Sequence, residues 1–293
     1  MNNILVPYDF DPQSDLAFEQ AIHLARHTHS GITLLYVHET HGILSGLFSS
    51  EQREEMLERI SDQMDAVAAK MSFRSGIDIN VRLETGRIYT VIVDVASEMQ
   101  AEFIVMGTRS FEPEPAGGIR MAGANASRVI RSARCPVITI GGKTHYDGCR
   151  TILLPVELNR ESTQKIKWAI RLAAIYGARV RVVATHEPDK SGRIKERLAK
   201  QVSAVRDQIS KAGIPGEADL LEVRQGEKTA VPTLLDYAEK KGDVDLIVIM
   251  TQQESAIVEF FIDSMAQEMI RRSEIPVMSV VPKEIVSPSG MES

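Results

Sequence analysis

The sequence has 293 residues, of which 43% are hydrophobic and 25% are charged, with a net charge of −6 and an isoelectric point near 5.7. The length suits two domains, each large enough to bury an apolar core without disulfides. The negative charge excludes nucleic acid or an anionic membrane as an obligate partner, because such partners need a basic face, but it does not exclude a small anionic ligand.

Cysteine usage and the N-terminus indicate a cytoplasmic protein. Cys135 and Cys149 lack the spacing of metal ligands, and we interpret them as reduced thiols. The N-terminus reaches Asp9 without a basic segment followed by an apolar one, so no signal peptide is expected. No apolar run approaches the ~20 residues of a membrane span, and no membrane contact is predicted.

Strands and helices are predicted to alternate along the first half. Residues 3–8 are an apolar run typical of a buried strand. Residues 13–27 have apolar side chains at helical spacing, with Asp11 or Ser14 as the cap and Gly31 as the end of the helix. Further strands are predicted at residues 32–37, 78–84, 103–106 and 136–140, and further helices at residues 52–71, 88–99 and 124–132.

The chain then repeats itself. Residues 4–10 match residues 152–158 at an offset of 148 residues. The offset falls to 144 for residues 104–106 and to 140 for residues 126–137, so the first half has longer loops. The second set of strands is predicted at residues 151–156, 179–185, 218–222, 246–250 and 276–281.

This order predicts an α/β fold of two repeated, open, parallel five-stranded sheets with helices on both faces. Apolar strands that alternate with helices favour parallel sheets covered on both sides. The predicted domains are residues 1–142 and 150–284. Glycines and polar residues over 141–150 indicate a short flexible linker between them.

Ligands of such sheets bind beyond the carboxyl ends of the strands, where the strand order reverses. Asp9 follows the first strand, and it either accepts hydrogen bonds from a ligand or serves as an N-terminal cap or turn residue for the next helix. Gly107 and Thr108 follow the fourth strand, and Gly123 precedes the helix that contains Asn125. Glycines before a helix N-terminus let backbone N–H groups approach a phosphate, although a glycine-bearing surface loop is the commoner explanation.

Four motifs resemble those of the universal stress protein family, in its tandem two-domain type: Val6-Pro7-Tyr8-Asp9, Val105-Met106-Gly107-Thr108, Gly123-Ala124-Asn125 and Cys135-Pro136-Val137. The resemblance covers nearly the whole chain, twice, and implies an adenine-nucleotide α-hydrolase-like fold. In ATP-binding members, an aspartate holds the adenine end and a glycine loop holds the phosphates. The resemblance therefore predicts ATP or another adenine nucleotide, with Mg, bound by six residues of the first half: Asp9, Val37, Gly107, Thr108, Gly123 and Asn125.

The ATP motif of the family is altered in this sequence. In the first half, Ser110 replaces the second glycine, twelve residues stand where nine are usual, and Ala124 replaces a hydroxyl residue. In the second half, Glu157 replaces Asp9, and the fourth strand is followed by Thr251, which the match places at the position of the first glycine. We therefore predict that the second ligand loop is degenerate.

Three functions fit these observations. The first is a stress-associated, nucleotide-binding sensor, the second a nucleotide-free interaction or scaffold protein with vestigial clefts, and the third a weak ATPase. The third is the least supported, because no general base or carboxylate pair for a metal lies near the loop, so neither an enzyme nor a metal site is predicted. The resemblance also implies an intramolecular pseudo-dimer, paired partly through strands 136–140 and 276–281, and it leaves a homodimer open.

Overall fold

The computed structural model describes residues 2–39, 50–108, 124–142, 148–157, 162–188, 192–251 and 264–281. The first half contains β1 (Asn3–Pro7), α1 (Pro12–Thr28), β2 (Gly31–His38), α2 (Ser50–Ser75), β3 (Ile79–Thr85), α3 (Ile88–Glu98), β4 (Phe103–Gly107), α4 (Ala124–Ser132) and β5 (Val137–Ile140). Each element predicted for this half is present, and only the ends differ by a few residues.

The second half repeats the order. It contains β6 (Thr151–Pro155), α5 (Ser162–Tyr176), β7 (Arg179–His186), α6 (Gly192–Lys211), β8 (Gly216–Glu222), α7 (Val231–Lys241), β9 (Leu246–Met250), α8 (Ser264–Arg272) and β10 (Val277–Val280). None of the helices in the described ranges combines the length and the apolar composition needed to cross a membrane.

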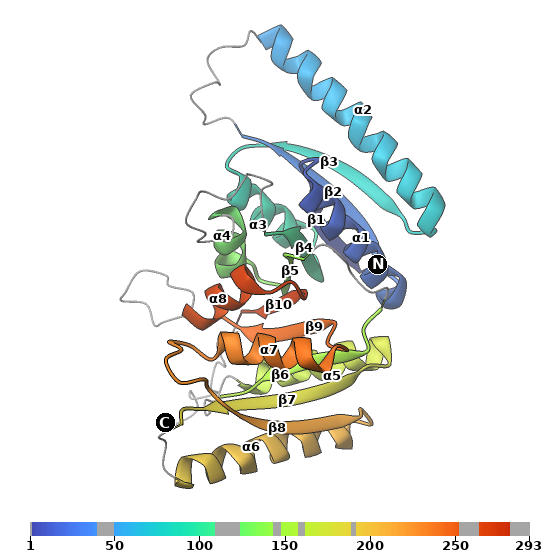
Figure 1. Ribbon diagram of the computed structural model, residues 1–293. Helices are drawn as coiled ribbons and strands as arrows, with labels where there is room; N and C mark the ends of the chain where they lie inside the picture. The colour runs from blue at the N-terminus through green and yellow to red at the C-terminus, as the bar shows by residue number, and fades with distance from the viewer. Residues whose placement is uncertain are drawn as a thin grey trace, which may run out of the picture.

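The strands of the described residues join into one ten-stranded sheet in the order β3-β2-β1-β4-β5-β10-β9-β6-β7-β8 (Figure 1). Within each half all pairings are parallel, whereas β5 and β10 pair antiparallel, with Ile138 opposite Met278. The expected pairing of the halves through their last strands is therefore confirmed. It protects one edge of each predicted five-stranded sheet.

The core consists of two apolar layers, one on each face of the sheet. Successive side chains of a strand point to opposite faces, so Ile4 and Val6 belong to one layer and Leu5 to the other. The first layer packs against α1, α2, α5 and α6, and the second against α3, α4, α7 and α8. This arrangement is a parallel sheet covered on both faces, as the apolar strands predict.

Local capping fixes both ends of α1, whose N-terminal end follows the carboxyl end of β1. Asp11 is the N-cap, and its side chain accepts a hydrogen bond of 2.8 Å from the N–H of Gln13. At the other end, His29 adopts the left-handed conformation with φ of 53° and donates its N–H to the carbonyl of Ala25. The prediction that Gly31 ends the helix is wrong, because Gly31 is already the first residue of β2.

The segment between the halves is packed where the structure describes it. Gly142 is buried, and a Cβ added to it would lie 2.0 Å from the carbonyl oxygen of Glu274. Cys149 is buried too, and the guanidinium of Arg150 binds the carboxylate of Asp245 at 2.8 and 3.0 Å. Gly142 therefore allows close contact between the halves, and the interpretation of this glycine as part of a flexible linker is wrong. Residues 143–147 lie outside the described residues.

Side chains also join the halves on the face covered by α1 and α5. The ring of Trp168 in α5 packs edge-on against Phe103 of β4, with ring centres 5.6 Å apart. Arg171 stacks on Trp168 and forms an ion pair with Glu102. Because Trp168 is the single tryptophan of the sequence, its fluorescence reports on this contact.

Candidate functional site

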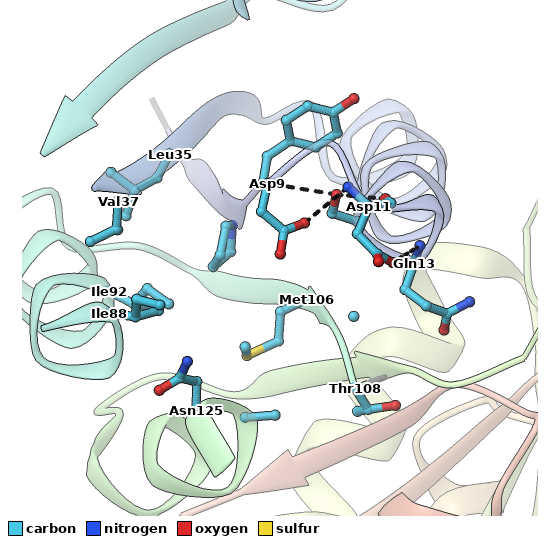
Figure 2. Close-up of a pocket in the computed structure, with 15 residues that line it drawn as sticks. Asp9, Asp11, Gln13, Leu35, Val37, Ile88, Ile92, Met106, Thr108 and Asn125 are labelled. Carbon is cyan, nitrogen blue, oxygen red and sulfur yellow. Dashed lines mark hydrogen bonds between the residues drawn. The ribbon is translucent and has the colours of Figure 1, made fainter. Parts of the chain in front are cut away.

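A cavity of about 210 Å³ lies at the carboxyl ends of β1, β2 and β4 (Figure 2). In the sheet β1 lies between β2 and β4, so this is the point where the strand order reverses and where ligands of such sheets bind. The volume is below the ~300–1,000 Å³ typical of pockets that enclose a drug-sized ligand. The cavity therefore suits one part of a ligand, such as a base or a sugar, with the remainder outside.

Asp9 stands two residues after the end of β1 and faces the cavity (Figure 2). One of its carboxylate oxygens accepts a hydrogen bond of 3.2 Å from the N–H of Asp11, and its own N–H lies 3.4 Å from the Ser14 hydroxyl. Asp11 is the N-cap of α1, so Asp9 does not cap this helix, but the bond from the Asp11 N–H confirms the alternative that Asp9 is a turn residue before it. Asp9 is exposed, so its carboxylate can also accept bonds from an amine or a hydroxyl of a ligand.

Two tyrosines, Tyr8 and Tyr36, are close enough to Asp9 to respond to its charge. Tyr8 is buried, and its hydroxyl donates to Asp15; burial, followed by this bond, raises the pKa of Tyr8 above its ordinary value. Burial and then the charge of Asp9 raise the pKa of Tyr36 as well. Both phenols therefore remain neutral at physiological pH, and neither serves as a general base there.

An apolar wall lies across the cavity from Asp9. It consists of Val37 at the end of β2, Ile88 and Ile92 in the first turns of α3, and Met106 of β4 (Figure 2). Such a wall suits the face of a flat heteroaromatic group. Sequence reasoning named Val37 but not the other three as site residues. The available signal was a pair of isoleucines four positions apart at the start of a helix, but this pattern equally predicts core packing.

Gly107 and Thr108 line the cavity, and both also have packing roles. A Cβ added to Gly107 would lie 3.0 Å from Cβ of Gln13 and 3.1 Å from its backbone carbon and oxygen, so a glycine lets α1 approach β4 closely. Thr108 is buried, and its hydroxyl donates to the carbonyl of Ile140 at 3.3 Å. The Thr108 hydroxyl therefore already has a hydrogen-bond acceptor within the sheet.

Asn125, in the first turn of α4, faces the cavity from the side opposite Asp9 (Figure 2). Gly123 and the rest of the predicted loop, residues 109–123, lie outside the described residues. The structure thus brings five of the predicted site residues to one cavity: Asp9, Val37, Gly107, Thr108 and Asn125. That they bind a nucleotide stays a prediction.

The register of the second half corrects one match between the halves. Gly107 pairs with Ile140 across β4 and β5, and Met250 pairs with Val280 at the corresponding place in β9 and β10. Met250, and not Thr251, therefore occupies the position of Gly107, and the offset of 144 in this strand is one residue too large. A long side chain stands here where the first half has none.

Comparisons with known proteins show the family and the fold of this chain. The profile of the universal stress protein family matches residues 1–141 and again residues 148–281. A universal stress protein of Methanocaldococcus jannaschii is 29% identical over 140 residues, which are 47% of this chain and 80% of that protein. The crystal structure of a universal stress protein from Archaeoglobus fulgidus has a TM-score of 0.75 and 16% identity, and the match covers 96% of this chain and 99% of that chain. A protein of unknown function from Pseudomonas aeruginosa has a TM-score of 0.67 and 16% identity, over 96% of this chain and 93% of its own.

Proposed function

The chain belongs to the universal stress protein family, and we propose that its first half binds an adenine nucleotide, such as ATP, in the cavity beside Asp9. The observation that carries this proposal is the convergence of Asp9, Val37 and Asn125 on one cavity where the strand order reverses. The resemblance to the family, some of whose members bind ATP, supplies the class of ligand.

The residues of the cavity fit the nucleoside end of such a ligand. Val37, Ile92 and Met106 offer an apolar surface to one face of the base. The carboxylate of Asp9 accepts a hydrogen bond from the exocyclic amine or from a ribose hydroxyl. Because the cavity holds only part of the ligand, the phosphates extend out toward α4, whose N-terminus carries a partial positive charge.

We propose a binding role in the cytoplasm, without catalysis. Asp9 and Asp11 both accept bonds from backbone N–H groups of their own turn, so these two carboxylates serve local structure as well. In the part of the chain that the structure describes, no group of three or more His, Cys, Asp or Glu side chains gathers to hold a metal ion. Mg²⁺ would therefore accompany the nucleotide through its phosphates. A phosphate-release assay with ATP and Mg²⁺ tests whether the protein hydrolyses ATP, and a rate above that of buffer would contradict the proposal that it does not.

The first test is to denature the purified protein and to identify released small molecules by chromatography and mass spectrometry. Titration calorimetry with ATP then compares the wild type with Asp9→Ala and with Glu157→Ala, the matched change at the corresponding position of the second half. We expect Asp9→Ala to weaken ATP binding about tenfold, because a hydrogen bond to a charged group is lost. Glu157→Ala should leave the affinity unchanged.

The nucleotide-free alternative makes the opposite prediction. A protein that is purified empty and that shows no heat of binding with millimolar ATP would contradict nucleotide binding. Such a result would favour the interaction or scaffold protein with vestigial clefts.

A further inference from the structure

Two arginines from different helices meet at the ring of Tyr89, close to the cavity. Arg87 directly precedes α3, and its Nη1 donates to the Tyr89 hydroxyl at 3.4 Å. Arg128 of α4 places its guanidinium 5.1 Å from the centre of the same ring. Ile88, next to Arg87, and Asn125, one turn before Arg128, both line the cavity, so the three side chains belong to the same two helix starts that contribute to its lining.

The two positive charges lie at the same aromatic ring. They lie 5.9 and 5.1 Å from one ring centre and are therefore at most 11.0 Å apart. Within the described ranges neither guanidinium forms an ion pair. The pKa of Arg87 is raised mainly by its hydrogen bond to Tyr89, and the charge of Glu39 is the smallest of the causes that act on this pKa. Like charges within this limit repel, and because both arginines are exposed to solvent the repulsion is weak. An anion placed between them would remove it.

The second half provides an internal comparison. α4 and α8 have the same length, and Ala126 and Ala266 are buried at the same position of each helix, so Arg128 corresponds to Glu268. Glu268 pairs with Arg272 at 2.8 Å. Both halves form the same fold with opposite charges at this position, so the fold does not require Arg128.

We propose that Arg87, Tyr89 and Arg128 form an oxyanion site that holds a phosphate group of the bound nucleotide at the rim of the cavity. This inference rests on the proposed function, since the base of the same ligand occupies the cavity. A guanidinium presents a planar set of N–H donors that matches phosphate oxygens, and the Tyr89 hydroxyl adds a third donor. Hydrogen bonding to Arg87 lowers the pKa of Tyr89, and a more acidic hydroxyl is a better donor. The site supplies phosphate contacts in a sequence where Ala124 replaces the usual hydroxyl residue.

The test compares ligands with and without phosphate. Adenosine and ATP are titrated by calorimetry, at low salt, into the wild type, into Arg128→Gln and into Arg74→Gln. Arg74→Gln is the matched control, because Arg74 is an exposed arginine at the end of α2. We expect Arg128→Gln to weaken ATP about tenfold while adenosine changes by less than about twofold, since one charge-assisted contact to phosphate is lost. Arg74→Gln should change neither affinity.

The outcomes separate this inference from the proposed function. If the wild type binds ATP and Arg128→Gln binds it equally well, the oxyanion site is wrong while nucleotide binding stands. If the wild type binds neither adenosine nor ATP, the proposed function fails, and inorganic tripolyphosphate then tests the rim alone. Saturable binding of tripolyphosphate that Arg128→Gln weakens would support the site, and no binding would overturn it. Circular dichroism checks that the variant folds.

Discussion

The close approach of α1 to β4 makes Gly107 a sensitive position, and Gly107→Ala tests it. The added Cβ would lie at 3.0–3.1 Å from Gln13, partly from its backbone, which is closer than ordinary contact. Gln13 cannot easily move, because it is 6% exposed and its N–H is held by the cap residue Asp11. The first turn of α1 must therefore shift, and Asp9 shifts with it.

The change in the free energy of unfolding of Gly107→Ala follows from two opposing effects. Overpacking a well-packed site costs about 1–3 kcal/mol of the free energy of unfolding. Replacing glycine with alanine restricts the unfolded chain, and this raises the free energy of unfolding by about 0.4–1 kcal/mol. Gly107 does not have a positive φ, so alanine adds no backbone strain there. We expect a net destabilisation of about 1 kcal/mol and, since Asp9 moves, weaker ATP binding.

Urea unfolding followed by circular dichroism measures this effect, with Gly31→Ala as the matched control. Gly31 also belongs to a strand, but a Cβ there would meet its nearest atom, the carbonyl oxygen of Asp78, at an ordinary 3.5 Å. The control should therefore be neutral or slightly stabilising. Equal unfolding midpoints for the two variants would refute the reasoning, because the steric term would then be absent.

Two further predictions concern the junction of the halves. Gly142→Ala places a Cβ 2.0 Å from the Glu274 carbonyl, so we expect a loss of about 2–3 kcal/mol in urea unfolding and a changed Trp168 emission, and a wild-type midpoint would contradict this. Burial raises the pKa of Cys149 from its ordinary 9.0 to about 12, so the thiol ionises first in the unfolded chain and stability falls as the pH rises from 9 toward 12. Cys149→Ala should flatten this part of the stability–pH curve, and an unchanged slope would argue against the effect.

The order of strands and helices could be predicted because local patterns determine it. The apolar runs of β1 and β4 and the helical stripe of α3 each indicate their element without knowledge of the neighbours. The pairing of β5 with β10 has no such local signal, and here the prediction came from the family resemblance alone. Local patterns therefore specify the elements, while the contact between the halves depends on tertiary structure.

The errors occur where different structures produce the same local pattern. Residues 104–106 resemble both 247–249 and 248–250, because every position in these runs is apolar, and only the hydrogen bonds of the sheet distinguish the two matches. The sequence pattern predicts a helix end at Gly31 and a linker at Gly142. Gly31 instead begins a strand, and Gly142 allows two backbones to touch. A glycine in a sequence shows that a side chain is absent but not which neighbour requires the space.

The candidate site was predictable where position alone identifies it. Asp9 follows a strand at the reversal of strand order, and any polar residue there is a candidate ligand contact. Ile88 and Ile92 were missed as site residues because an apolar residue that lines a cavity and one that fills a core have the same pattern in sequence. The distinction depends on which side chains the opposite wall leaves uncovered, and this is known only after folding.

The two halves differ at three positions that line the cavity of the first half or lie on an element that lines it. Three corresponding pairs carry the difference: Gly107 and Met250, Asp9 and Glu157, and Arg128 and Glu268. Both members of each pair occur within the same fold, so the fold tolerates either side chain. The polar and charged groups near the carboxyl ends of the strands therefore differ between the halves although the fold is the same. A nucleotide in the second half would meet a long side chain at Met250, and its phosphate would approach the negative charge of Glu268, which is unfavourable. The asymmetry of the pairs therefore favours one nucleotide per chain, bound by the first half.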